Sequence, residues 1–293
     1  MNVYAIYINT HRYDYALTSI CAASVRYWYP EIEIYLIADF LNGKAITGFL
    51  KKKLNVKVFN TYRKKFGWGY GKLETLFNDN GKCYLVIDAD TVLTGPVLNT
   101  VNNVNAHFVV DDEVQPEEKF SILYYDLKRI AGIDKTFVYP GYSFNTGQWF
   151  GTAGVICRKD FDGIINWTEP PSSKFPGIIF QGEQGHLNLL MHQMEQQGKL
   201  KISRKKIMIW PDGVNADFIN IDKIKSKSSD YPFIIHWAGL KFKNIEDYPR
   251  ADILLFYRQF YYSHLSFTEK LADKFWIFYL QVEKKIKHKF FRN

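Results

Sequence analysis

A chain of 293 residues with 47% hydrophobic residues is long enough for one large α/β domain or two smaller ones, and we expect a globular protein. Its formal net charge of +8 and its aromatic content of 17% favour anionic or flat partners, such as nucleotides, anionic lipid or nucleic acid. Three isolated cysteines match no disulfide framework or zinc site, and no stretch approaches the ~20 apolar residues of a spanning helix, so we expect a reducing, cytoplasmic setting.

The first third of the chain predicts alternating strands and a helix. An apolar run over 3–8 ends in the polar residues Asn9, Thr10 and His11, which is typical of a strand that delivers a loop. Apolar residues at helical spacing predict a helix over 15–28, and further strands are expected over 33–38 and 56–59. This βαβ pattern is typical of a nucleotide-binding half-domain. No Gly-x-Gly-x-x-Gly motif follows the first strand, so a dinucleotide site is not expected.

The next strand ends in two carboxylates. Residues 83–87 form an apolar run typical of a buried strand, and Asp88 and Asp90 follow it. Because ligands bind at the carboxyl ends of strands in α/β sheets, the pair could hold a divalent cation and leave room for phosphate oxygens. A solvated strand end is the alternative, since Asp-x-Asp is frequent by chance. Lys72, in a helix expected over 71–78, is either an exposed lysine or a phosphate ligand that reaches back toward the carboxylates.

The middle of the chain carries further candidates. A strand expected over 106–110 ends at Asp111 and Asp112. The glycine-rich segment 139–157 allows close approach of a ligand and offers Asn145 as donor and acceptor, or it is a core strand flanked by two turns. A helix then begins with Glu183 and Gln184, whose polar groups could face a cleft or only complement the helix dipole.

Toward the end of the chain, a short strand leads into His236. Residues 233–235 are apolar, and a tight turn at Gly239 and the basic Lys241 follow. A lone histidine in an apolar run is more often a hydrogen-bonded core residue than a ligand. Its place at a strand end, beside a glycine and a lysine, would instead deliver a metal ligand and a phosphate-binding lysine together.

Residues 265–293 predict one amphipathic helix with many lysines. Such a helix either lies on an anionic membrane surface or packs its apolar stripe on the rest of the protein and solvates its lysines. The apolar stripe consists of Leu271, Phe275, Phe278, Tyr279, Val282, Ile286 and Phe290.

Three blocks of the sequence, taken together, resemble a known family. Residues 71–92, 182–190 and 236–241 read GKLETLFNDNGKCYLVIDADTV, GEQGHLNLL and HWAGLK. In order and spacing they are similar to the conserved blocks of the retaining glycosyltransferases of the glycogenin and bacterial galactosyltransferase type, over about residues 3–243. The resemblance implies a GT-A fold, an α/β, Rossmann-like mixed sheet flanked by helices. We therefore expect a catalytic domain over 1–245 and a basic, aromatic helical extension over 246–293.

The resemblance also implies a reaction and a set of site residues. The expected enzyme moves a hexose from a nucleotide-sugar, expected to be a UDP-sugar, to a glycan or lipid-linked acceptor, with Mn²⁺ or Mg²⁺ as cofactor. If the helical extension binds lipid, the enzyme would lie on the inner face of a membrane. The resemblance implies that Asp88, Asp90 and His236 are metal ligands and that Asp88 also contacts the donor sugar. Lys72 and Lys241 would bind the diphosphate, and Glu183 and Gln184 would lie near the anomeric carbon. The rest of the donor would be bound by Asn9, Thr10, Tyr15 and Asn145, with Tyr15 stacked on the base.

Three positions depart from the family pattern. The family usually has Asp where Glu183 stands. Its final lysine falls on Phe242, which Lys241 and Lys243 flank, and we assign the role to Lys241. Its Asn-x-Gly element matches either 145–147 or 152–154.

Other functions fit the sequence less well than glycosyl transfer. A sugar nucleotidyltransferase would usually carry a glycine-rich, basic phosphate loop, and none follows the first strand. A non-catalytic protein of the same fold would not need Asp88, Asp90 and His236 to be intact. Nucleic-acid binding would explain the positive charge, but no recognised motif supports it. If the transfer inverted configuration, Asp111, Asp112 or Glu183 would have to act as the base.

Overall fold

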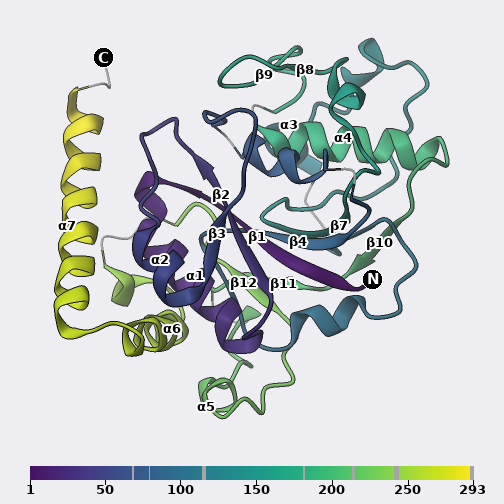
Figure 1. Cartoon of the computed structure of the whole chain (residues 1–293). Helices are drawn as coiled ribbons and strands as arrows, with labels where there is room; N and C mark the ends of the chain where they lie inside the picture. Colours follow the sequence, from purple (N-terminus) through teal and green to yellow (C-terminus); the bar gives the residue numbers. More distant parts are fainter. Residues whose placement is uncertain are drawn as a thin grey trace.

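The computed structural model describes residues 1–67, 69–78, 80–113, 117–180, 182–212, 215–240 and 244–290. Its centre is a seven-stranded sheet in the order β10-β6-β7-β4-β1-β2-β3, flanked by helices on both faces (Figure 1). The predicted α/β mixed sheet with a helical C-terminal extension is therefore confirmed. The strands are β1 (Val3–His11), β2 (Glu33–Asp39), β3 (Val56–Val58), β4 (Cys83–Asp88), β6 (Phe108–Asp111), β7 (Gln148–Thr152) and β10 (Ile202–Lys205).

The sheet is apolar on both faces, which explains why its central strands read as continuous apolar runs. In β4, Leu85 and Ile87 pack into one hydrophobic core, and Tyr84 and Val86 pack into a second core on the opposite face. Strand β1 is paired in parallel with both β2 and β4, and Asn9 lies opposite Asp88 in this register. The polar ends of β1 and β4 therefore meet at one edge of the sheet.

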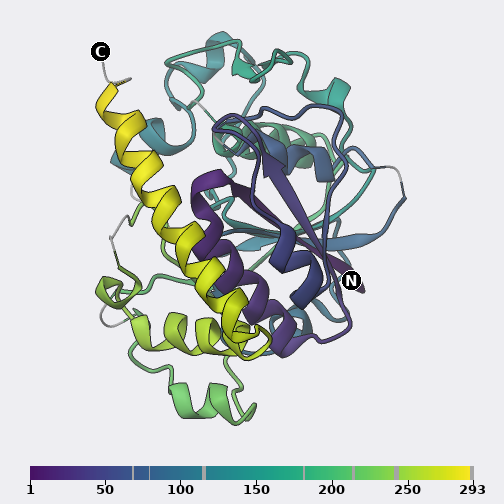
Figure 2. The ribbon, with the colours of Figure 1, turned by 60° about the vertical axis from the view of Figure 1, so that its left-hand side comes forward.

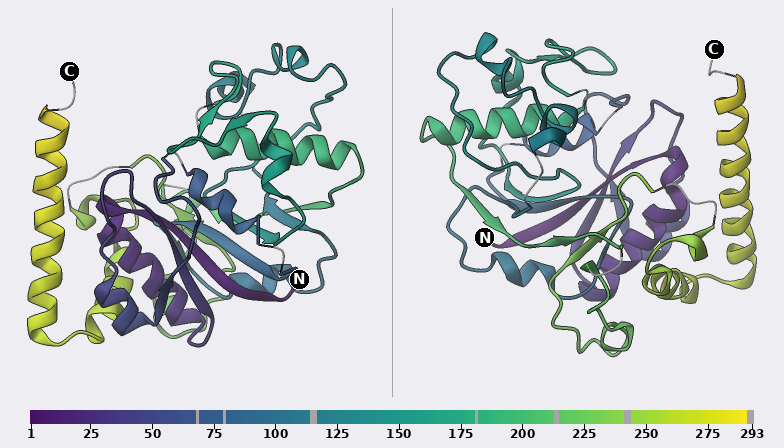
Figure 3. Two further views of the ribbon diagram at one scale, coloured as in Figure 1. Left: turned by 45° about the horizontal axis from the view of Figure 1, so that its top comes forward. Right: turned by 180° about the vertical axis from the view of Figure 1, so that it is seen from behind.

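Each face of the sheet is covered by its own helices. Helix α1 lies on the face of the first core, and α4 lies on the other side of the sheet (Figures 1 and 3). The helix expected over 71–78 is instead a short 3-10 helix, η2 (Tyr70–Thr75). The α-helices are α1 (Tyr15–Trp28), α2 (Gly48–Leu54), α3 (Glu117–Leu123), α4 (Glu183–Gln196), α5 (Ile221–Lys225), α6 (Ala251–Ser263) and α7 (Phe267–Phe290), and the other 3-10 helices are η1 (Arg12–Asp14), η3 (Val97–Val101), η4 (Ile130–Gly132), η5 (Arg158–Phe161) and η7 (Ile245–Asp247).

A second, three-stranded sheet carries His236. Its strands are ordered β11-β12-β5, and β12 is antiparallel to β5, with His236 opposite Thr91. Because β5 follows the Asp88–Asp90 turn directly, this pairing brings the histidine to the end of β4. The strands are β5 (Thr91–Leu93), β11 (Met208–Ile209) and β12 (Ile234–His236), and a two-stranded sheet pairs β8 (Ile165–Asn166) with β9 (Ser172–Ser173).

The C-terminal helix α7 crosses the outer side of α1 (Figure 2). It packs through Asp273, Ile277 and Leu280, of which Asp273 is fully buried and Leu280 is 4% exposed. The described part of the predicted apolar stripe faces away, with Phe275 and Phe278 more than 60% exposed. The interpretation that this stripe packs on the rest of the protein is therefore wrong, because the opposite face of the helix makes that contact. In the described part of the chain, no helix is long and apolar enough to cross a membrane.

Candidate donor and metal site

Two carboxylates and one imidazole converge at the carboxyl edge of the sheet. The side chains of Asp88, Asp90 and His236 offer ligand atoms within 4.8 Å of one another. Octahedral ligands at bonds of ~2.1 Å stand at most about 4.2 Å apart, so side-chain shifts of well under an ångström would close them on one cation. Carboxylates suit Mg²⁺ and Mn²⁺, whereas imidazole is typical of transition-metal ions such as Fe²⁺ and Zn²⁺, so this donor set fits a divalent cation of more than one kind.

The histidine is held in place from several sides. His236 Nε2 lies 3.2 Å from Asp90 Oδ1, and its ring is stacked on Trp210 at a centroid distance of 5.7 Å. Its buried Nδ1 has no hydrogen-bond partner among the described residues. Burial lowers the pKa of His236, but the Asp90 carboxylate outweighs burial and raises it above its ordinary value. The same contact lowers the pKa of Asp90 although burial opposes it.

A glycine makes room for this ring. A Cβ atom on Gly147 would stand 2.1 Å from His236 Cε1 and 2.6 Å from Nδ1. The Gly147 N–H donates to Asn145 Oδ1 at 2.7 Å, and its carbonyl accepts from the Asp88 N–H at 2.8 Å. Asn145, one of the predicted donor-binding residues, therefore shapes the turn that admits the histidine, and it also lines the cleft.

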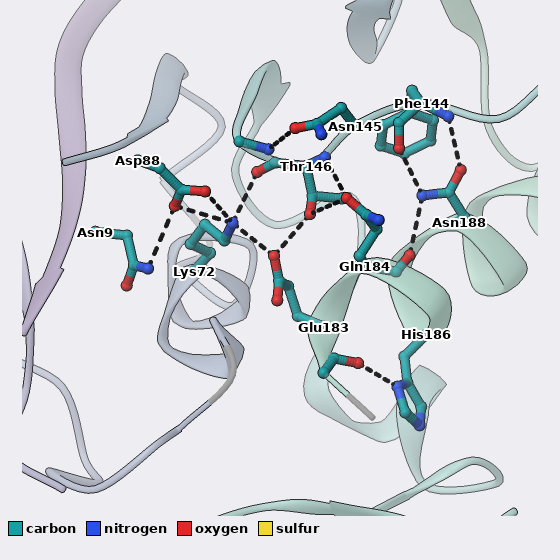
Figure 4. A network of polar contacts seen from close by, with 12 residues as sticks. Asn9, Lys72, Asp88, Phe144, Asn145, Thr146, Glu183, Gln184, His186 and Asn188 are labelled. Atoms are coloured by element: carbon teal, nitrogen blue, oxygen red, sulfur yellow. Dashed lines mark hydrogen bonds and ion pairs between the residues drawn. The ribbon is translucent and has the colours of Figure 1, made fainter. Parts of the chain in front are cut away.

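Lys72 is buried between two carboxylates (Figure 4). Its Nζ lies 3.0 Å from Asp88 Oδ1 and 2.5 Å from Glu183 Oε1, and it donates to the Thr146 carbonyl at 2.8 Å. Burial lowers the pKa of Lys72, but the two carboxylates outweigh it and raise the pKa above its ordinary value. Of the two interpretations of Lys72, the exposed helix-end lysine is wrong, because the side chain is only 3% exposed.

The first turn of α4 is part of the same network (Figure 4). Glu183 Oε1 also accepts from Thr146 Oγ1 at 2.7 Å, so this oxygen serves both a lysine and a hydroxyl. Gln184 Oε1 accepts from the Thr146 N–H at 3.2 Å, and its Nε2 donates to the Leu123 carbonyl at 3.1 Å. Gly69 keeps space for Glu183, because a Cβ there would stand 2.1 Å from Oε2.

All these groups line one cleft of about 2250 Å³. Asn9 also lines it and donates to Asp88 Oδ1 at 3.3 Å. Thr10 and Tyr15 do not line it: Thr10 is hydrogen-bonded to Thr18 in the core, and Tyr15 is 2% exposed with its hydroxyl on Asp273. The expectation that Tyr15 is free to stack on a base is wrong for this structure. Lys241, with its neighbours 242–243, lies outside the described residues.

The alternative bases of an inverting reaction are not all in the cleft. Asp111 is fully buried, and its Oδ1 accepts from the Ile207 and Met208 N–H groups at 2.7 Å. Burial raises the pKa of Asp111. Neither Asp111 nor Asp112 lines the cleft: Asp111 holds the backbone of Ile207 and Met208, and exposed Asp112 lies 3.4 Å from Arg204.

Several cleft residues were missed by sequence reasoning. Tyr13 and Asp14 of η1 line the cleft where Thr10 and Tyr15 were expected, and Trp210 forms the wall behind His236. Thr146 joins Lys72, Glu183 and Gln184. The sequence signals for these residues were that Thr146 is polar and precedes Gly147, and that Trp210 is aromatic and directly follows β11. Their partners in the cleft are distant in the chain, so the signals alone did not identify them.

Known proteins resemble this chain in their fold alone. No protein-family model and no curated protein sequence matches the chain. The bifunctional glycosyltransferase WbbM is similar with 12% identity and a TM-score of 0.55, covering 87% of this chain and 49% of that one. The galactosyltransferase LgtC, in complex with donor and acceptor sugar analogues, is similar with 12% identity and a TM-score of 0.55, covering 92% and 99%. An active-site mutant of LgtC gives 12% identity and a TM-score of 0.53, covering 87% and 95%. The chain spans about half the length of WbbM and nearly all of LgtC, and it has the GT-A fold of these glycosyltransferases.

Proposed function

We propose that this chain is a metal-dependent glycosyltransferase that moves a hexose from a UDP-sugar to a glycan or glycolipid acceptor, with retention of configuration. The observation that carries the proposal is the convergence of Asp88, Asp90 and His236 beside Lys72 at the carboxyl edge of the sheet. The fold is that of a galactosyltransferase whose structure holds donor and acceptor sugar analogues, which supports the same class of substrates here.

The proposed division of labour follows from charge. Cleavage of a sugar–phosphate bond leaves a diphosphate with growing negative charge and a sugar with oxocarbenium character. A bound Mn²⁺ or Mg²⁺ would supply Lewis-acid stabilisation of the diphosphate. Asp88, Asp90 and His236 are the residues that would hold it, and Lys72, together with Lys241 as predicted from the sequence, would add positive charge for the phosphates.

On the sugar side, Gln184 is the candidate neighbour of the anomeric carbon. Its amide lies at the cleft surface and is fixed by Thr146 and by the Leu123 carbonyl. In a single-step retaining transfer the acceptor would attack from the face of the leaving group, and a phosphate oxygen would take its proton. The anomeric configuration of the product, read from the NMR coupling of its anomeric proton, tests retention, and an inverted product would contradict it.

Hydrolysis of the donor tests the enzyme itself. We expect slow, Mn²⁺-dependent release of UDP from a panel of UDP-hexoses, reduced at least 100-fold in Asp90→Ala and unchanged in the control Asp217→Ala, an exposed carboxylate outside the cleft. Full activity in Asp90→Ala would break the site assignment. Formation of a nucleotide-sugar from a sugar phosphate and UTP would instead show a nucleotidyltransferase.

We also propose that α7 lies on the inner face of an anionic membrane. Its outer face exposes Leu271 at 52%, Phe275 at 62% and Phe278 at 64%, beside lysines of the same helix. Apolar side chains flanked by lysines suit the interface of an anionic bilayer. Binding to phosphatidylglycerol vesicles should fall in Phe275→Ser/Phe278→Ser but not in the control Phe218→Ser, which is 49% exposed elsewhere. Equal binding by both variants, or none by the intact chain, would refute the proposal.

A further inference from the structure

The inner face of α7 changes character along its length. Near its middle, Ile277 and Leu280 pack on the first core. One and two turns further along the same face stand Lys284 and Lys287, and both line the cleft. Lys285 and Arg258, the latter from α6, line the cleft as well. We call Arg258, Lys284, Lys285 and Lys287 the basic wall.

The helix that carries the basic wall is fixed to the body of the protein. Buried Asp273 accepts hydrogen bonds from the hydroxyls of Tyr261 at 3.1 Å and Tyr262 at 3.0 Å, and also from Tyr15. Glu269 forms ion pairs with Lys52 and Lys53 on α2. These contacts fix α7 to α1, α2 and α6, so the basic wall is a fixed side of the cleft.

Positive side chains outnumber carboxylates along this wall. Lys287 is 3.4 Å from Glu283, whose other oxygen is 2.9 Å from Arg12 on η1. Lys284 and Lys287 lie 6.0 Å and 5.7 Å from the centre of the Tyr13 ring. Two further carboxylates among the described residues lie nearby: Asp14, whose pKa burial raises although His11 and Lys284 oppose the rise, and Glu246, which is 3.9 Å from Arg258. A positive excess inside a cleft attracts an anionic ligand.

The size of the cleft leaves room for a second substrate beside the donor. Its volume of about 2250 Å³ exceeds the ~300–1,000 Å³ that a small-molecule pocket usually has. The donor diphosphate would already find positive charge in Lys72 and in a cation held by Asp88, Asp90 and His236, which come from β4, its turn and β12. The basic wall lies on α6 and α7, so its positive charge is available to an anionic group other than the donor diphosphate.

We propose that the basic wall binds the phosphate of the acceptor, so that the acceptor is a sugar carried on a phosphate or diphosphate and not a neutral glycan. The statement that the bound anion belongs to the acceptor rests on the proposed function, whereas the anion site itself depends only on the four side chains. Lysine and arginine form charge-assisted hydrogen bonds with phosphate oxygens, which are stronger than bonds between neutral groups.

Calorimetric titration of the full-length chain with octyl diphosphate, in the presence of saturating UDP and Mn²⁺, tests the site. We expect binding that is at least 10-fold tighter than that of octyl glucoside, and at least 10-fold weaker in Lys284→Gln/Lys287→Gln than in the intact chain. The control Lys223→Gln/Lys225→Gln removes the same charge from exposed α5, outside the cleft, and should keep the affinity of the intact chain.

Three results would overturn the inference: equal binding of octyl diphosphate and octyl glucoside, equal loss in both double variants, or competition between octyl diphosphate and UDP. A separate titration with UDP and Mn²⁺ separates the two proposals: a chain that fails to bind UDP refutes the donor site, while octyl diphosphate titrated without nucleotide still measures the wall through the difference between the two double variants. Inorganic pyrophosphate as a second probe distinguishes a free phosphate site from one that needs the alkyl chain of a lipid headgroup. Weakening of both probes by the wall variant supports a phosphate site open to either source.

Discussion

At the scale of single residues, the metal site depends on the absence of one side chain. Gly147→Ala would place a methyl group 2.1 Å from His236 Cε1, so the imidazole must leave its position. We expect Mn²⁺ affinity, measured by calorimetry, to fall at least 10-fold with little change in the far-UV circular dichroism. Gly163→Ala is the matched control, because no atom of the described residues lies within 4 Å of its new Cβ. Unchanged Mn²⁺ affinity in Gly147→Ala would show that His236 is not a ligand.

The buried lysine supports a prediction on stability. Lys72→Gln leaves Asp88 and Glu183 side by side without a cation, and breaking a buried ion pair costs about 3–5 kcal/mol. We expect the free energy of unfolding, from urea denaturation, to fall by about 3 kcal/mol. The exposed control Lys201→Gln should change it little. Adding Glu183→Gln to Lys72→Gln should recover part of the loss, since one orphan carboxylate is removed, and a purely additive double variant would contradict this coupling.

Two buried histidines make stability depend on pH. Burial lowers the pKa of His186 to about 4 and that of His192 to about 3 from the ordinary value of 6.5. Below pH 6.5 these histidines take up protons in the unfolded chain but stay neutral in the folded chain, so their contribution to stability is fully present above pH 6.5 and is lost progressively toward pH 3. His192→Gln should flatten the decline of the urea midpoint between pH 7 and 5, and the exposed control His264→Gln should not. An equally steep decline in His192→Gln would contradict the assignment.

Some residues of the site could be predicted from the sequence and others could not. Asp88, Asp90 and His236 could be named because each follows an apolar run at a strand end, and the order of the blocks joined them. The direction of the Tyr15 side chain could not be predicted, since it depends on Asp273, a residue 258 positions away. The contacts of Glu183 with Lys72 and Thr146 are a consequence of packing that no motif describes.

At the scale of elements, helix α7 is attached by a buried carboxylate. Asp273→Ala removes the acceptor of three tyrosine hydroxyls, two of them buried, and each buried group left without a partner costs ~1–3 kcal/mol. We expect the free energy of unfolding to fall by about 3 kcal/mol and hydrogen exchange to speed up along α7. Asp273→Asn keeps an acceptor and should cost less, and the exposed control Asp230→Ala should cost little. Unchanged exchange in Asp273→Ala would show that other contacts hold the helix.

The elements themselves divide into those the sequence predicts and those it does not. The central strands β1, β2 and β4 and helices α1 and α4 were predicted near their observed bounds, because both faces of the sheet are buried and their apolar runs are long. The segment before β4 was expected to be an α-helix, but only the 3-10 helix η2 forms there. The face that α7 turns inward was missed, because a helix with aromatic residues on one side and Ile277 and Leu280 on another has two candidate packing faces.

At the scale of the whole molecule, the fold joins distant segments into one cleft. Pairing of β12 with β5 brings His236 to the carboxylates of β4, and α7 closes the cleft on the side of η1. The predicted division at residue 245 stays a prediction, although α6 packs Tyr257 and Tyr261 into the same core as α1. Tertiary pairing of this kind is not contained in any single segment of the sequence.

The position of the metal is the most direct test of this account. We predict that crystals grown with MnCl₂ and UDP show one manganese peak in anomalous difference maps, with Asp88, Asp90 and His236 as protein ligands at about 2.0–2.3 Å and the UDP diphosphate completing the coordination. A manganese peak elsewhere, or UDP bound in the cleft with these three side chains unliganded and still paired as they are here, would contradict it.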